Sequence, residues 1–297
     1  MDHLQSLRLF ARVVERRSFT TAAADLNVPR STATEAIRRL EGRLGARLLE
    51  RTTRHVAPTP DGQLYYERCT AILAELDDAE AVLRDSEPHG RLRMDAPGLL
   101  TRTFLLPGLP AFLARYPRIQ LHIGQTDRLV DLVREGVDCV LRVGEPVDSG
   151  LMLRRLGMIS EVTVASPDYL ARHGVPRSID DLAGHRMIGF LSSLTGDVMP
   201  LEFTVDGTPH EVRLPVQVSA NHSDTSADLA RAGLGLVQAP RYRFAAELAA
   251  GTLVEVLADH PPTPTPLSAL YPHNRHLAPR LRVFLDYITD IFRQAAL

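Results

Sequence analysis

The first sixty residues contain three stretches in which apolar positions recur every three or four residues, separated by short polar breaks. This spacing predicts a first helix over about residues 2–16. A second and a third helix are predicted on either side of residues 27–29, because the proline there disfavours helical geometry in the residue before it. The alanines at 22–24 leave room for two helices to approach closely, and Thr20 or Thr21 is expected to cap the second helix.

The third predicted helix, residues 30–44, separates inward from outward positions. Ala33, Ile37, Leu40 and Leu44 form the stripe that is expected to face the core. The outward positions combine short hydroxyls with arginines, which suits base edges and phosphates in a DNA major groove. With two residues of the preceding helix, the predicted DNA contacts are Ser18, Thr20, Arg30, Ser31, Thr32, Thr34, Glu35, Arg38 and Arg39. An ordinary helical hairpin with a solvated basic face is the alternative.

A small two-stranded wing is predicted over residues 48–58. Its polar tip carries Arg51, Thr53 and Arg54, and arginine at such a tip suits a narrow minor groove or the phosphates beside it. Together with the two helices before it, the wing indicates a DNA-reading winged helix-turn-helix over residues 1–59. A solvated hairpin is the alternative for the tip residues taken alone.

A long helix is predicted to follow, because Thr59-Pro60-Asp61 supplies a capping hydroxyl, a proline at the first helical position and an acid in the first turn. One apolar seam runs along it at alternating spacings of four and three, and such a helix needs a partner. The simplest partner is the same helix of a second copy, which predicts a two-fold dimer. The seam consists of Tyr65, Cys69, Ile72, Leu76, Ala79 and Leu83. Cys69 is interpreted as a packed apolar side chain and not as a reactive thiol.

From residue 90 onward, short apolar runs typical of strands alternate with helical patterns, which predicts parallel sheet covered by helices. The expected elements of a first unit are strands at 91–96, 119–124 and 138–143 and helices at 104–116 and 128–135. Those of a second unit are strands at 160–164, 187–191, 201–205, 211–218 and 235–238 and helices at 167–173, 226–232 and 242–250. Residues 259–266 are expected to return to the first unit, and 279–296 to form a closing helix.

Composition adds a charge asymmetry to this picture. Residues 1–60 hold eleven arginines against six acidic residues, whereas the whole chain has a formal net charge of -2. A basic head on an acidic body fits DNA at one end only. The two cysteines, Cys69 and Cys139, show no metal-ligand or disulfide spacing, and neither a signal peptide nor a membrane-spanning run is visible, so a cytoplasmic protein without metal or cofactor is expected.

The motifs resemble those of the LysR-type transcriptional regulators over essentially the full length of the chain. In the first part these are Leu9-Phe10, Ser18-Phe19, Ala22 to Ala24, Ile37-x-x-Leu40-Glu41-x-x-Leu44-Gly45-x-x-Leu48-Leu49-x-Arg51-Thr52 and Thr59-Pro60-x-Gly62. In the second part they are Pro107-x-Leu109-x-x-Phe112-x-x-x-Tyr116-Pro117, Gly136-x-Asp138-x-x-x-Arg142 and Ala232-Gly233-Leu234-Gly235. The resemblance implies a winged helix-turn-helix, a dimerisation helix over residues 60–89, and a two-lobed α/β effector domain similar to periplasmic binding proteins over 90–297. Its lobes would cover about 90–161 with 267–297, and 162–266.

The same resemblance implies an effector site between the two lobes. Its residues would be Gly98, Leu99, Leu100, Thr101, Arg102, Gln125, Thr126, Arg142, Val143 and Gly144 from the first lobe and Phe190, Ser192, Asn221 and His222, followed by Ser223 and Asp224, from the second. Hydroxyls, backbone amides and an arginine favour a small carboxylate or a similar anion. Salt-bridged surface arginines, a helix-capping threonine and plugging leucines are the alternatives for these residues.

The resulting expectation is a regulator that binds double-stranded DNA as a dimer or tetramer and responds to a small effector, with RNA polymerase as a further partner if it activates. A ligand-independent repressor with a degenerate cleft stays open as an alternative. A solute-binding protein or an enzyme is disfavoured, because no Ser/His/Asp order, nucleotide-binding glycine loop or diagnostic carboxylate pair is present.

Overall fold

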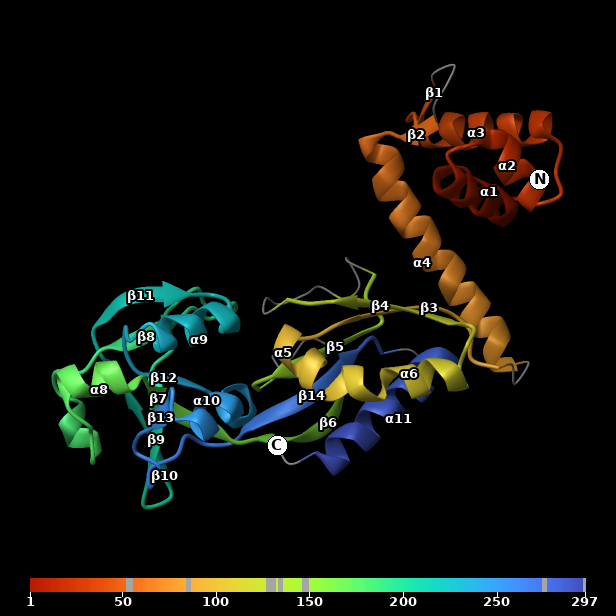
Figure 1. Ribbon diagram of the computed structural model, residues 1–297. Coiled ribbons are helices and arrows are strands. Elements are labelled where there is room, and N and C mark those ends of the chain that lie inside the picture. Colours follow the sequence, from red (N-terminus) through yellow and green to blue (C-terminus); the bar gives the residue numbers. More distant parts are fainter. Residues whose placement is uncertain are drawn as a thin grey trace. The chain divides into compact units, whose positions relative to one another are not determined.

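The computed structural model describes residues 1–51, 56–83, 87–126, 132, 136–145, 150–273 and 277–295, and divides into two compact units, Met1–Glu87 and Pro88–Leu297 (Figure 1). Each unit has its own hydrophobic core. The first unit combines three helices, a two-stranded sheet and a long fourth helix, and the second consists of two α/β lobes. None of the described helices is long and apolar enough to span a membrane.

The three N-terminal helices begin and end close to the predicted positions. They are α1 (His3–Arg16), α2 (Phe19–Asp25) and α3 (Arg30–Leu44). The cap of α2 differs from the prediction: the Ser18 hydroxyl, and not Thr20 or Thr21, accepts a hydrogen bond from the Thr21 backbone N–H at 3.3 Å. Ser18 precedes the helix in extended geometry, which is the position where a short hydroxyl reaches the free N–H groups of the first turn.

The core of the first unit confirms most of the predicted stripe of α3. Ala33, Ile37 and Leu40 are buried, and Ala36 joins them. Leu44 was predicted to be buried but is 41% exposed, because α3 ends there and Gly45 turns the chain away with a left-handed φ of 66°. Ala22 and Ala23 are buried at the α1–α2–α3 contact, whereas Ala24 is exposed.

The wing and the long helix follow as predicted. Strands β1 (Leu49–Arg51) and β2 (Val56–Pro58) pair antiparallel, with residues 52–55 outside the described part of the chain. The Glu41 carboxylate of α3 accepts hydrogen bonds from the backbone N–H groups of Leu48 and Leu49 and so ties the wing to the reading helix. Helix α4 (Pro60–Leu83) is capped by Thr59, whose hydroxyl accepts the Gly62 N–H at 2.9 Å.

The first lobe of the second unit is built on a five-stranded sheet in the order β4-β3-β5-β14-β6. Its strands are β3 (Gly90–Asp95), β4 (Ile119–Gly124), β5 (Cys139–Val143), β6 (Met152–Ile159) and β14 (Thr265–Tyr271). The predicted parallel arrangement holds for β3, β4 and β5, but β14 runs antiparallel to both of its neighbours. The chain leaves the first lobe at the end of the sheet where β3, β4 and β5 finish, and it returns from the second lobe at that same end, so β14 runs in the opposite direction to these strands. Strand β6 was not predicted.

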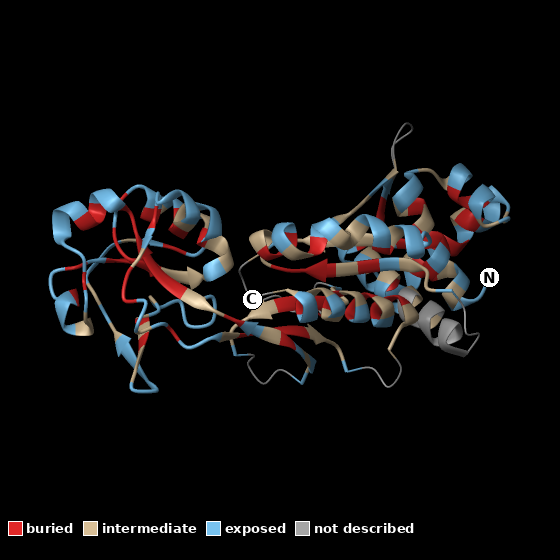
Figure 2. Ribbon diagram, turned by 60° about the horizontal axis from the view of Figure 1, so that its bottom comes forward, coloured by how far each residue is buried: buried red, intermediate tan, exposed pale blue. Residues whose placement is uncertain are grey.

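Helices cover this sheet and complete the core of the first lobe (Figure 2). They are α5 (Gly98–Leu100), α6 (Leu106–Arg115) and α11 (Pro279–Gln294), with a π-helical turn over Thr101–Leu105 between the first two. The apolar pattern predicted a helix only from residue 104, whereas the family resemblance implied that one starts at Gly98 to Arg102, where α5 begins. The π turn closes with the Leu106 N–H donating to the Thr101 carbonyl, and Tyr287 of α11 donates its hydroxyl to the Leu105 carbonyl at 2.7 Å. The predicted helix at 128–135 lies outside the described residues except for Leu132.

The second lobe contains three small sheets. Strand β7 (Glu161–Ala165) lies between β12 (Val237–Pro240) and β13 (Val254–Glu255); β8 (Met187–Phe190) pairs parallel with β11 (Val216–Ala220); and β9 (Leu201–Val205) pairs with β10 (Thr208–Val212). The single strand predicted over residues 211–218 is therefore two strands, interrupted near Pro215, which has no backbone donor. The helices are α8 (Pro167–His173), α9 (Ser223–Arg231) and α10 (Ala245–Ala250), with 3-10 turns at Ile179–Leu182 and Arg241–Phe244.

Candidate nucleic-acid interface and effector site

The outward face of α3 carries the residues that the sequence analysis selected for DNA contact. Arg30, Ser31, Thr32, Glu35, Arg38 and Arg39 are exposed. The opposite face of α3 packs in the core of the first unit through Ala33, Ala36, Ile37 and Leu40, and this packing holds the exposed face in place. Thr34 is half-buried, and its hydroxyl donates to the Arg30 carbonyl at 3.0 Å, which leaves only its oxygen lone pairs for another group.

Charge along α3 is partly paired. The Arg39 guanidinium lies 3.1 Å from the Glu35 carboxylate, one turn away, and both side chains remain more than half exposed. Exposed pairs of this kind are weak, so phosphate can compete for Arg39. Within the described residues Arg30 and Arg38 have no ion-pair partner, which leaves two uncompensated positive charges on this face.

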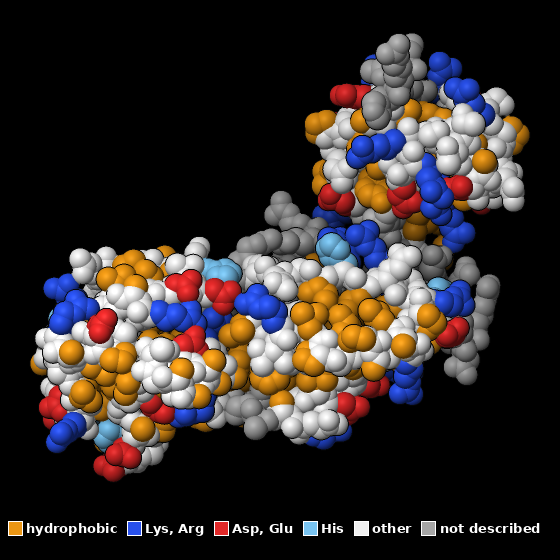
Figure 3. Space-filling model, in the orientation of Figure 1, with side chains coloured by type: hydrophobic (Ala, Val, Ile, Leu, Met, Phe, Trp, Pro, Cys, Tyr) orange, Lys and Arg blue, Asp and Glu red, His pale blue; other side chains and the backbone are white. Residues whose placement is uncertain are grey.

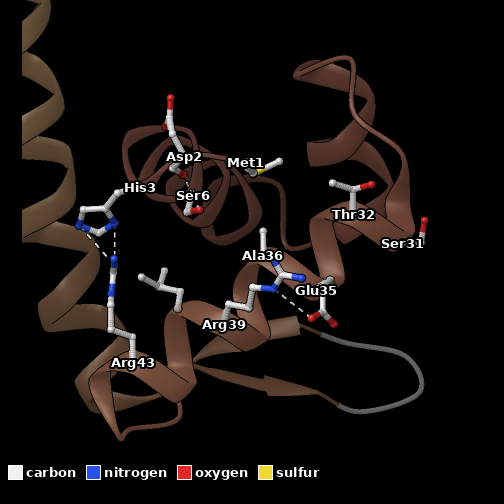
Figure 4. A pocket seen from close by; sticks show the side chains of 11 residues that line it. Met1, Asp2, His3, Ser6, Ser31, Thr32, Glu35, Ala36, Arg39 and Arg43 are labelled. Carbon is white, nitrogen blue, oxygen red and sulfur yellow. Dashed lines mark hydrogen bonds and ion pairs between the residues drawn. The ribbon is translucent and has the colours of Figure 1, made fainter.

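An open cavity of about 530 Å³, with both polar and apolar lining, adjoins this face between α3 and the N-terminal end of α1 (Figure 4). The side chains that line it from α3 include Ser31, Thr32, Glu35 and Arg39. On the other side, His3 lies 2.6 Å from the Arg43 guanidinium. Sequence reasoning missed this hollow, because it depends on how the first turn of α1 packs beside α3.

The remaining predicted DNA contacts divide into three groups. Ser18 caps α2 and also accepts the Thr21 hydroxyl at 3.1 Å, so its side chain has a structural task. Thr20 is exposed on α2. The backbone of Arg51 lies in β1, but its side chain, together with Thr53 and Arg54, lies outside the described residues.

Three of the predicted effector residues come together at the start of the first lobe's helical segment. A Cβ added to Gly98 would lie 3.0 Å from the Gln125 amide oxygen and 3.5 Å from the Arg102 guanidinium. Gly98 begins α5, Arg102 lies on the π turn and Gln125 follows β4, so three separate segments meet at one place. We call Gly98, Arg102 and Gln125 the Arg102 cluster.

The Arg102 cluster is joined to the second lobe by an ion pair. Arg102 Nη2 lies 3.3 Å from Oδ2 of Asp224, in the first turn of α9. Oδ1 of the same carboxylate accepts a hydrogen bond of 2.7 Å from Arg243, whose side chain is 6% exposed and also donates to the Ser223 hydroxyl. Burial alone would raise the pKa of Asp224, but the hydrogen bonds and charges of Arg243 and then Arg102 lower it below its usual range. Sequence reasoning did not select Arg243.

Several other predicted effector residues are committed to the interior. Leu100 and Thr101 are fully buried, the threonine hydroxyl donating to the Pro97 carbonyl, so neither presents a side chain to a ligand. Arg142 forms an ion pair of 3.2 Å with Asp95, both nearly buried. The alternative interpretation of Arg142, a salt-bridged arginine instead of a ligand contact, is therefore confirmed, although the ion pair lies in the interior and not at the surface.

The predicted residues of the second lobe are mainly turn and cap residues. The Ser192 hydroxyl accepts the Leu194 and Thr195 N–H groups, and Nδ1 of His222 accepts the Asp224 N–H at 3.3 Å as the N-cap of α9. Asn221 is exposed and Phe190 half-buried. On the first-lobe side, Leu99, Thr126, Val143 and Gly144 are half-buried.

The predicted dimer seam of α4 is partly buried in the first unit and partly exposed. Tyr65 packs on Phe10 of α1 with ring centroids 5.5 Å apart, and Cys69 is 1% exposed in the core of its own unit. These two residues therefore do not form part of an open seam. Ile72 is 51% exposed and Leu76 half-exposed, whereas the side chains of Ala79 and Leu83 lie outside the described part. The exposed Leu64 was not predicted.

The two cysteines and the possible metal ligands of the described residues form neither a reactive thiol site nor a metal site. Burial raises the pKa of Cys69 to about 11 and that of Cys139 to about 12, so both remain protonated and unreactive at neutral pH. Among the described residues, no three His, Cys, Asp or Glu side chains are grouped to hold a metal ion.

Comparisons with known proteins agree with this geometry. Residues 4–63 match the bacterial regulatory helix-turn-helix proteins of the lysR family, and residues 85–293 match the LysR substrate binding domain. The chain is 35% identical to the uncharacterized HTH-type transcriptional regulator YhjC of Escherichia coli (strain K12), over 99% of each chain. It is 34% identical to the HTH-type transcriptional regulator CrgA of Neisseria meningitidis serogroup C, over 96% of each.

A solved structure extends this similarity to three dimensions. The structure of CrgA from Neisseria meningitidis, a LysR-type transcriptional regulator, matches with a TM-score of 0.60 and 33% identity, covering 97% of this chain and 98% of that one. The matches span both units, and they place this chain among DNA-binding regulators and not among enzymes. A helix-turn-helix unit followed by an effector-binding unit, with relatives that match along the whole chain, shows that the protein belongs to the LysR family of transcriptional regulators.

Proposed function

We propose that α3 enters the major groove of a specific operator and that Arg30 and Arg38 supply its main positive contacts. The observation that carries this proposal is the exposed face of α3, where hydroxyls lie beside Arg30 and Arg38, which have no ion-pair partner in the part of the chain that the structure describes, and where a buried stripe backs the helix. Ser31, Thr32 and Glu35 offer hydrogen-bonding groups to base edges from the first turns of the helix. The cavity beside α1 is where a flanking phosphate backbone would run, near Arg39 and Arg43.

The regulating effector is proposed to be a small carboxylate or a similar anion that binds at the Arg102 cluster. An arginine more than half exposed, with the Gln125 amide side chain and the backbone of Gly98 close beside it, supports this choice. Effector binding regulates DNA binding only if the ligand prefers one arrangement of the assembly over another. RNA polymerase is an additional partner if the protein activates, and the protein is proposed to act in the cytoplasm.

Self-association is proposed to use the outward face of α4, beyond the residues that pack on α1. Two reading heads then meet two half-sites of a palindromic or nearly palindromic operator. Figure 3 shows apolar side chains gathered over the first lobe near α6, where Leu106 is 43% exposed, which supports a further contact between effector units in a tetramer.

The test is a gel shift against the DNA upstream of the protein's own gene and its divergent neighbour, with nonspecific competitor and a salt series. The wild type is expected to give a competitor-resistant shift. Arg38→Ala is expected to weaken operator binding about 5- to 150-fold, which corresponds to the loss of one arginine contact. Arg293→Ala is the matched control, because Arg293 is also an exposed arginine and lies at the end of α11 in the other unit.

Two results would contradict these assignments. Unchanged operator affinity in both Arg30→Ala and Arg38→Ala would remove α3 from the proposed interface. If no member of a carboxylate and metabolite library changes the shift, the ligand-independent repressor becomes the better description. DNA binding and effector response are thus tested separately.

A further inference from the structure

The ion pair between Arg102 and Asp224 places a carboxylate of the chain itself on the arginine that is proposed to receive the effector. Arg102 belongs to the first lobe and Asp224 to the second, and α5 and α9 face each other across the two lobes (Figure 1). We propose that Asp224 competes with the effector for Arg102. The carboxylate of the effector must displace the Asp224 carboxylate from Arg102 in order to bind. This inference rests on the effector site proposed above and adds how that site is regulated.

The two oxygens of Asp224 are held unequally. Oδ1 lies 2.7 Å from a nearly buried Arg243, which is fixed further by the Ser223 hydroxyl. Oδ2 lies 3.3 Å from Arg102, whose side chain is 51% exposed. Asp224 therefore keeps a charged partner when Arg102 leaves, whereas within the described residues Arg102 has no other ion-pair partner than Asp224. An exposed pair of this length is weak, so a ligand can replace it.

Arg102 also lies on an unusual backbone segment. The π-helical turn Thr101–Leu105 carries both Arg102 and Phe104, and Phe104 meets Tyr242 of the second lobe with ring centroids 5.0 Å apart. Single π turns inside helices occur frequently at functional sites. One turn thus presents an ionic and an aromatic contact to the other lobe, and only the ionic contact is open to exchange with a dissolved anion.

Displacement of Asp224 from Arg102 would break the ionic contact between the lobes and leave the aromatic contact in place. A carboxylate on Arg102 leaves Asp224 on Arg243 within its own lobe, so α9 loses its ionic link to the first lobe while Phe104 still contacts Tyr242. Occupancy of the site is thereby coupled to the arrangement of the two lobes, which gives an effector different affinities for two arrangements. Uncharged analogues of the ligand have no means to make this exchange.

The experiment measures the reactivity of single arginines in the full-length protein toward phenylglyoxal, mapped by mass spectrometry, with sodium acetate as the probe. Asp224→Asn is expected to raise the modification rate of Arg102, because the competing charge is lost. Acetate is expected to protect Arg102 at a concentration up to about 5-fold lower in Asp224→Asn than in the wild type, as for the loss of one exposed ion pair. Acetamide, which has no charge, is expected to protect in neither.

The chain offers a matched control in another exposed pair. Arg154 and Asp286 lie 2.9 Å apart within the first lobe. Asp286→Asn is expected to raise the reactivity of Arg154 and to leave that of Arg102 unchanged, and Asp224→Asn is expected to do the reverse. Unchanged Arg154 reactivity in Asp224→Asn also reports that the first lobe is folded, and Asp224→Ala serves as a second variant if the asparagine protein is unstable.

Two different failures can be told apart. If acetate protects Arg102 equally in the wild type and in Asp224→Asn, the site binds carboxylates but Asp224 does not compete, and the inference is overturned. If acetate protects Arg102 in neither protein, or acetamide protects as well as acetate, the proposed carboxylate site itself is wrong and the inference falls with it. The gel shift of each variant without acetate shows independently whether DNA binding persists.

Discussion

Gly62 shows how a single residue fixes the joint between the wing and the long helix. A Cβ at this position would lie 1.8 Å from the Leu48 carbonyl oxygen, a distance that no real side chain allows. Its N–H donates to the Thr59 hydroxyl, and that hydroxyl donates in turn to the Arg47 carbonyl. The Thr-Pro-x-Gly motif in the sequence thus serves two structural purposes: Thr59 caps the helix, and Gly62 allows two backbone segments to approach closely.

Gly62→Ala is therefore expected to destabilise the first unit by about 1–3 kcal/mol, because Leu48 and the start of α4 must move apart. Gly42→Ala is the matched control: Gly42 lies in α3 with nothing within 4 Å of an added Cβ, so alanine is expected to be neutral or to stabilise by up to about 1 kcal/mol. Chemical denaturation followed by circular dichroism measures both. Equal stability of the two variants would contradict the close approach.

At the scale of elements, α4 divides its apolar residues between two partners. Tyr65 and Cys69 pack on the core formed with α1, whereas Ile72 and Leu64 stay exposed on the helix surface. A heptad pattern in the sequence cannot distinguish these two fates, because packing on the same chain and packing on a second copy require the same apolar spacing. The open part of the seam is consequently shorter than the sequence predicted.

Ile72→Asp is expected to halve the mass of the particle in solution, because a charge at an interface formed by two copies of α4 meets its symmetry mate and loses its water. Multi-angle light scattering of the full-length protein measures this. Gln63→Asp places the same charge at an exposed position of α4. Its mass should equal that of the wild type, and an unchanged mass for Ile72→Asp would exclude this part of α4 from the interface.

At the scale of the whole molecule, the chain consists of two units that each bury their own core. Ile37 is fully buried in the first unit, and Leu141 is fully buried in the second. Among the described residues, the core cluster of the first unit contains residues of that unit alone, and the three clusters of the second unit contain residues of that unit alone. Such an organisation favours separate cooperative unfolding of the DNA-binding and effector-binding parts.

Calorimetry is therefore expected to resolve two transitions with separate responses to mutation. Ile37→Ala should destabilise one transition by about 2–5 kcal/mol through the cavity that it leaves, and Leu141→Ala should destabilise the other by a similar amount. Each variant is the control for the other. A single transition that both substitutions lower together would show that the two units unfold as one.

The sequence by itself determined the local elements of the first unit, most of those of the second, and the resemblance to the family. Proline at 29 and 60, glycine at 45 and the apolar spacing of α3 act through neighbouring residues, so α3, α4 and the wing were predicted close to their observed bounds. The reversed entry of β14, the internal pairing of Arg142 with Asp95 and the packing of Cys69 on its own unit instead of on a second copy depended on segments far apart in the chain. Only the tertiary structure brought Arg102, Asp224 and Arg243 together, because an ion pair between lobes has no periodicity or spacing in the sequence.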